Sequence, residues 1–141
     1  MKNRQRWLTK KIKGDYIENE DLIRVVMFET FLHYIEEELS LITIFAEKKR
    51  KEISVDDFFS YTWSEDLEQG HVTKPQVKKY TARLKELKKA YIYITQEREI
   101  LNKRFYQTIK TDESEQIENE MNEKDQQTLA IILKHRLTLW T

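Results

Sequence analysis

The sequence contains no cysteine, only one proline and only two glycines among its 141 residues. The missing thiols exclude disulfides, thiolate nucleophiles and cysteine-ligated zinc. So few helix-breaking residues favour long helices over hairpin-rich sheets. No run approaches the ~18 consecutive apolar residues of a membrane span, and the basic segment 1–13 lacks the apolar core of a signal peptide. We therefore expect a soluble cytoplasmic protein that does not enter a membrane.

The sequence also lacks a recognisable cofactor or nucleophile motif. Gly14 and Gly70 stand alone, so there is no glycine-rich phosphate loop. The serines have no nucleophile-elbow context. His71 and His135 have no evident partner along the chain. No cofactor is therefore expected.

Charged residues are abundant, at 35% of the chain, and cancel to a net charge of zero. Their distribution is uneven. Residues 74–110 carry eleven Lys or Arg against three Glu, whereas residues 112–125 carry seven acids against one lysine. A turn near 110–112 would fold the acidic segment onto the basic one, so the two are expected to neutralise each other.

Apolar residues recur at helical spacing in the first half of the chain. They predict a central helix over about 21–50 that is apolar on most sides, with Leu32 and Ile35 fully buried. A serine followed by two acids opens a short aromatic helix over about 55–63. Residues 64–73 have no periodicity and form the main loop of the prediction.

The second half predicts two further long helices, over about 75–109 and 113–139. The first would be about 50 Å long, so it either bends near 96–99 or projects. Together the segments predict a single all-α domain over 1–141, a helical bundle of three long helices and one short one, with 1–18 as a basic N-terminal arm. The near-continuous apolar seams are compatible with a homo-oligomer.

One candidate site is a row on the central helix, where Glu29, His33 and Glu36 follow one another at i, i+4 and i+7. Carboxylates and imidazoles on a helix can hold a metal. The order His-x-x-Glu, however, occurs once, whereas di-iron bundles use Glu-x-x-His on two helices. Further acids at 65–68 and 115–118 lie outside strongly apolar helices. A solvated polar stripe is the favoured interpretation, and a metal-dependent helical hydrolase is the third functional hypothesis.

A second candidate is the basic surface of the long helix, which offers cations for phosphate groups. Its residues are Lys78, Lys79, Arg83, Lys85, Lys88 and Lys89. Interleaved tyrosines (Tyr80, Tyr91, Tyr93) could stack bases, but they fall mostly on the apolar stripe, and the pI of about 6.9 is unlike that of dedicated nucleic-acid binders. A nucleic-acid-binding helical protein using residues 74–110 is therefore the second hypothesis.

A third candidate is a set of aromatic residues expected to be exposed, Trp63, Trp140 and Phe58. Tryptophan anchors protein interfaces disproportionately. Trp140 lies one residue from the end of the sequence, where it either docks on a partner or closes its own bundle. These residues support the first hypothesis, a non-enzymatic protein-interaction module.

Three segments resemble uncharacterised small proteins of tailed-phage genomes. They are DLIRVVMFETFLHYIEEELSL (21–41), KAYIYITQERE (89–99) and RLTLWT (136–141). The positions that match the family pattern are Tyr34, Ile35, Glu36, Glu38, Leu139, Trp140 and Thr141. The tryptophan pair and Arg-Pro segment of that pattern are absent here, replaced by Tyr91, Tyr93 and Gln96–Arg98. The resemblance implies a phage-encoded accessory or host-interfering protein that acts in the host cytoplasm on a protein partner, with no assigned activity.

Overall fold

The computed structural model describes residues 19–37 and 54–135, and the regular secondary structure within them is entirely helical. The long units are α2 (Asn19–Glu37), a rod made of α5 (Lys74–Ile92), the π-helix η3 (Tyr93–Glu97) and α6 (Arg98–Gln107), and α7 (Glu113–Lys134). Two short helices precede the rod, α3 (Val55–Phe59) and α4 (Ser64–Glu68). The predicted all-α fold with three long helical units is confirmed.

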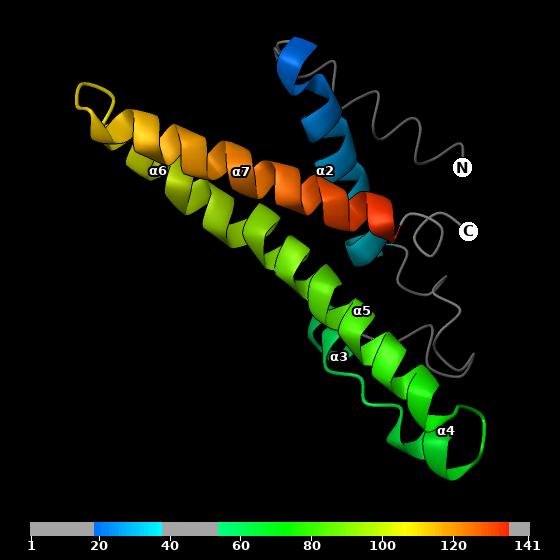
Figure 1. Cartoon of the computed structure of the whole chain (residues 1–141). Coiled ribbons are helices and arrows are strands. Elements are labelled where there is room, and N and C mark those ends of the chain that lie inside the picture. Colours follow the sequence, from blue (N-terminus) through cyan, green and yellow to red (C-terminus); the bar gives the residue numbers. More distant parts are fainter. Residues whose placement is uncertain (1–18, 38–53, 136–141) are drawn as a thin grey trace.

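The rod and α7 form an antiparallel helical hairpin that diverges along its length (Figure 1). α7 lies against α6 near the connecting turn and separates from α5 toward its own C-terminal end. α2 crosses α7 and reaches α5, to which it is joined by a hydrogen bond from the Tyr91 hydroxyl to the Glu36 carboxylate (3.1 Å). α3 packs on α5. The end of the hairpin around the turn lies away from α2, α3 and α4 (Figure 1).

The start of the rod follows from local sequence. The Thr73 hydroxyl accepts a hydrogen bond from the Gln76 backbone (3.3 Å), and the Gln76 side chain accepts one from the Thr73 backbone (2.8 Å). This reciprocal pair satisfies two donors that the first helical turn leaves unpaired. Pro75 occupies the first turn, where it removes no helical hydrogen bond. The predicted start of the long helix is confirmed.

The segment between Ser54 and Thr73 differs from the prediction of one helix followed by a loop. α3 does begin after a Ser54 cap, whose hydroxyl accepts from the Asp57 backbone (3.1 Å), but it ends at Phe59. Trp63 then adopts a left-handed backbone conformation (φ 60°), and α4 forms within the predicted loop. Such a conformation costs a bulky residue about 1–3 kcal/mol. Burial of the Trp63 ring, which is 1% exposed, offsets that cost.

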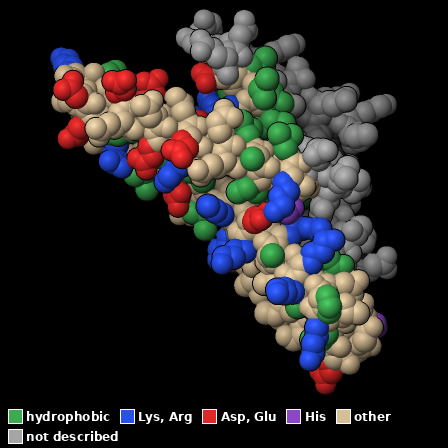
Figure 2. Space-filling view, in the orientation of Figure 1, with side chains coloured by type: hydrophobic (Ala, Val, Ile, Leu, Met, Phe, Trp, Pro, Cys, Tyr) green, Lys and Arg blue, Asp and Glu red, His purple; other side chains and the backbone are tan. Residues whose placement is uncertain are grey.

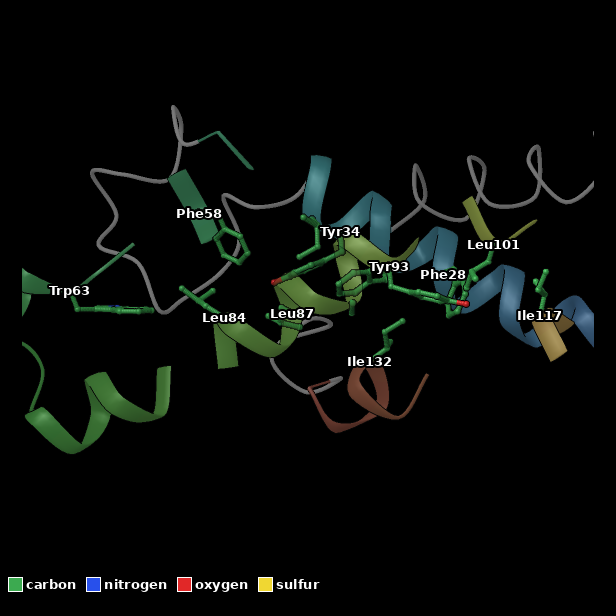
Figure 3. Close-up of a cluster of buried hydrophobic side chains, with 13 residues drawn as sticks. Phe28, Tyr34, Phe58, Trp63, Leu84, Leu87, Tyr93, Leu101, Ile117 and Ile132 are labelled. Atoms are coloured by element: carbon green, nitrogen blue, oxygen red, sulfur yellow. The ribbon is translucent and has the colours of Figure 1, made fainter. Parts of the chain in front are cut away.

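The core is a long row of side chains along the hairpin axis, running from Trp63 past Tyr93 to Ile117 (Figure 3). Ile35 is fully buried, as predicted, but Leu32 is only half-buried. At 100° per residue Leu32 falls at the edge of the face that Phe31 and Ile35 turn to the core. The expectation for Leu32 is therefore wrong.

The long helix is interrupted by a π-helical turn, η3, over residues 93–97. This turn overlaps the predicted bend near 96–99 but begins three residues earlier. A π turn adds a residue to the helical ladder and so changes which side chains face the partner helix. Here it directs both Tyr93 and Arg98 at α7. The rod continues beyond η3, and its α6 portion projects together with α7 (Figure 1).

Several predictions fall on parts of the chain outside the described residues. These are the basic arm 1–18, the continuation of the central helix over 38–50, and the end of the last helix over 136–139. None of the helices in the described ranges combines the length and the apolar content that a membrane span requires.

Candidate functional site

Two of the aromatic residues expected at an interface lie in the core. Trp63 is 1% exposed and Phe58 is fully buried, so the expectation that they are exposed is wrong. The reversal between α3 and α4 folds them onto α5, where the Trp63 ring lies 5.6 Å from the Tyr80 ring. Trp140 lies outside the described residues.

Large apolar side chains are exposed instead near the end of the α6–α7 hairpin. Ile100, Tyr106 and Ile109 are 58%, 64% and 55% exposed. Ile100 and Tyr106 lie off the stripe formed by Leu101 and Phe105, which packs against the core, whereas Ile109 lies beyond the end of α6 at Gln107. The sequence shows this for Ile100 and Tyr106, which break the three-four spacing, but not for Ile109, which continues it. We call Ile100, Tyr106 and Ile109 the hairpin-tip residues.

The acidic run of α7 surrounds the same end of the molecule. Its exposed carboxylates are Glu113, Glu115, Glu118, Glu120 and Glu123. Within residues 19–37 and 54–135, the ion pairs of this run are Glu120 with Lys124 on the same helix, and Asp125 with Arg98 and Arg24. One of these pairs, Asp125 with Arg98, joins the acidic run to the basic segment 74–110. In the described residues the other acids of the run pair with no cation of that segment, so the expected neutralisation is limited to this one pair, although the turn near 110–112 is present. Lys and Arg gather over α5, whereas the end of the hairpin around the turn carries most of the acids together with some Lys and Arg (Figure 2).

The basic surface predicted on the long helix is present on α5. Lys78, Lys79, Lys85, Lys88 and Lys89 are exposed and Arg83 is half-buried. In the described part of the chain none of them forms an ion pair with an acid. We call these six residues the basic face.

The tyrosines do not provide a stacking platform beside this face. Tyr80 and Tyr91 are half-buried and Tyr93 is buried. The guanidinium of Arg83 lies over the Tyr80 ring at 5.8 Å, which positions this cation and covers that ring.

A cleft of about 290 Å³ lies between α5 and the C-terminal end of α7. It is lined by Lys79, Ala82, Arg83, Glu86, Lys134 and His135. The Glu86 carboxylate contacts Lys134 Nζ at 2.8 Å and His135 Nε2 at 2.6 Å. These hydrogen bonds hold the pKa of Glu86 below its ordinary value. Sequence reasoning left His135 without a partner because Glu86 lies 49 positions away.

A buried carboxylate, Asp125, joins three elements of the fold. It accepts hydrogen bonds from the Tyr93 hydroxyl (2.6 Å) and from Arg98 Nε and Nη2 (2.9 and 3.1 Å), and Arg24 of α2 lies 3.8 Å away. Burial and the bond to Asp125 raise the pKa of Tyr93, which therefore stays a hydrogen-bond donor. Burial lowers the pKa of Arg98, but its hydrogen bonds to Asp125 outweigh this and raise it. With its polar groups paired, this cluster acts as a structural junction.

The predicted metal row does not form a ligand cluster. Glu29 and His33 are half-buried, and Glu36 is exposed and accepts the Tyr91 hydrogen bond. By helical periodicity the row falls on the side of α2 away from Phe31. Across the described residues, the acids at 65–68 and 115–118 included, no group of three or more His, Asp or Glu side chains could hold a metal.

No family model, curated protein or solved structure matches this chain.

Proposed function

We propose that this chain is a non-enzymatic protein-interaction module and that the hairpin tip is its binding element. The observation that carries the proposal is the exposure of Ile100, Tyr106 and Ile109 at an end of the hairpin that α2, α3 and α4 leave uncovered. Exposed apolar side chains rimmed by charge are typical of protein-binding surfaces. Tyrosine is enriched among the residues that dominate binding energy, so Tyr106 is the expected anchor.

The charge around the tip indicates the chemistry of the partner. Glu113, Glu115 and Glu118 are exposed, and within the described residues they have no ion pair. A partner that presents an apolar pocket bordered by Lys or Arg would complement both features. Such charges would act mainly on the rate of association and on specificity, since exposed pairs contribute only about 0–1 kcal/mol each.

The phage resemblance extends this proposal to a biological setting. A phage-encoded accessory protein in the host cytoplasm would use the tip to engage a host protein, including one whose activity the phage blocks. The feature of the fold that supports this is the projecting helical hairpin. Such a hairpin is already ordered, so it loses little conformational freedom on binding.

The test is affinity purification from the host followed by mass spectrometry, with two matched variants. The tip variant carries Ile100→Gln, Tyr106→Ser and Ile109→Gln, and the control carries Leu22→Gln and Ile23→Gln, which replace apolar residues exposed on α2. We expect one or a few proteins to co-purify with the unmodified chain and the control but not with the tip variant. Recovery of the same proteins with all three chains would refute the tip as the binding element.

The basic face favours a second candidate, nucleic-acid binding through α5. Its five lysines are exposed, and none of its cations has an acidic partner among the described residues, which favours contact with phosphate groups. A salt titration with generic DNA and RNA tests this candidate. Binding at ~0.15 M salt with a steep salt dependence, weakened by Lys78→Gln, Lys85→Gln and Lys88→Gln together, would support it. Absence of binding would exclude it.

A further inference from the structure

The cleft between α5 and the end of α7 is separate from the hairpin tip and plays no part in the proposed protein binding. Lys79, Arg83 and Glu86 lie at i, i+4 and i+7 of α5 and therefore share one helix face. Ala82, on the same side, is too small to fill the space between them. Lys134 and His135 close the opposite wall.

The charges in this cleft are not balanced. Among the described residues that line it, three cations, Lys79, Arg83 and Lys134, face one carboxylate, Glu86. Glu86 already binds both Lys134 and His135. Lys79 and Arg83 are therefore left without an acidic partner in the described part of the chain.

The charged side chains that line this cleft are held in place by contacts within the protein. The side chain of His135 is 9% exposed and fixed on Glu86 at 2.6 Å. Glu86 also fixes Lys134 at 2.8 Å. Arg83 is held over the Tyr80 ring. Cations that are already positioned lose less conformational entropy when they bind an anion.

We propose that this cleft binds a phosphate group. Arg83 offers a planar fork of donors that matches phosphate oxygens, and Lys79 adds a point charge from the preceding turn. At about 290 Å³ the cleft has room for the phosphate and for part of the molecule that carries it. The phosphate belongs either to a small phosphomonoester or to a nucleic-acid backbone that runs along the basic face.

The test measures binding of inorganic phosphate to the full chain by calorimetry at ~0.15 M salt. Lys79→Gln with Arg83→Gln removes the two cations of the cleft that have no acidic partner among residues 19–37 and 54–135. Lys78→Gln with Lys85→Gln is the control, because it removes the same charge from exposed positions of the same helix outside the cleft. We expect the cleft variant to bind phosphate at least about tenfold more weakly, since hydrogen bonds between charged groups are lost. The control should change affinity by no more than about twofold.

Two results would overturn the proposal. One is no detectable binding of phosphate to the unmodified chain, together with an unchanged NMR signal from the His135 ring. The other is equal weakening in both variants, which would mean that α5 attracts anions only through its net charge. Circular dichroism of each variant establishes that its helices are retained.

A single-stranded oligothymidine of about twelve nucleotides distinguishes the two sources. If the phosphate belongs to a nucleic-acid backbone, the oligonucleotide should bind more tightly than inorganic phosphate and both variants should weaken it. If it belongs to a phosphomonoester, inorganic phosphate should bind more tightly than the oligonucleotide. Only the variant without Lys79 and Arg83 should then bind inorganic phosphate more weakly.

Discussion

Replacement of Asp125 by alanine is expected to destabilise the fold more than replacement of any exposed acid of α7. Asp125 accepts one hydrogen bond from Tyr93 and two from Arg98, and Arg24 lies within 3.8 Å. Removing one partner of a buried ion pair costs about 3–5 kcal/mol, because the other charge stays buried and uncompensated. The Arg98 side chain is 22% exposed and recovers part of its hydration. We therefore expect the lower end of that range, about 3 kcal/mol.

Urea unfolding followed by circular dichroism measures this loss. Asp125→Asn should cost about half as much, because an amide oxygen still accepts from Tyr93 but no longer balances Arg98. Glu123→Ala, at an exposed site on the same helix, is the matched control and should change stability by less than about 0.5 kcal/mol. An Asp125→Ala chain within about 0.5 kcal/mol of the unmodified protein would refute the junction as the element that joins α2, the rod and α7.

Three further predictions concern the core and pH. Ile35→Ala should destabilise by about 2–5 kcal/mol in urea unfolding, and Leu32→Ala by clearly less, because only Ile35 is fully buried; equal losses would contradict the assigned face of α2. Trp63→Ala should destabilise the fold by about 3–5 kcal/mol by the same assay. Trp63→Gly should destabilise it by no more than Trp63→Ala, because glycine tolerates the positive φ. A larger loss of stability with glycine would argue against the left-handed turn. The lowered pKa of Glu86 means that its interactions stabilise the fold above its ordinary value of 4.5 and are lost as the pH falls through the lowered pKa. Glu86→Gln should therefore reduce the urea midpoint at pH ~7, and this reduction should shrink as the pH falls below 4.5; a reduction that stays constant over that fall would contradict the linkage.

The sequence predicted those features that depend on neighbours within one or two helical turns. The Thr73 cap with Pro75 and the apolar stripes are local signals, and the rod and α7 follow from them. Trp63 could not be anticipated in the same way. Only glycine signals a left-handed residue reliably, and here the burial of an indole ring stabilises it instead.

The two charged clusters, around Asp125 and around Glu86, could be recognised only in the tertiary structure, although the sequence contains a sign of each. Asp125 interrupts the buried stripe of α7 between Ile117 and Ile132, where an acid requires a partner. Glu86 is the single acid of α5, and its pairing with His135 across 49 positions depends on how far α7 diverges from α5. Helical periodicity alone contains no such information.

The most direct test of the proposed interface places a photo-crosslinking phenylalanine analogue at Tyr106 in the host, with the same analogue at Ile23 as the control. Both positions are more than half exposed, but only Tyr106 lies at the hairpin tip. The account predicts a discrete adduct with a host protein from position 106 and none from position 23. No adduct from position 106, or the same adducts from both positions, would contradict the hairpin tip as the binding element.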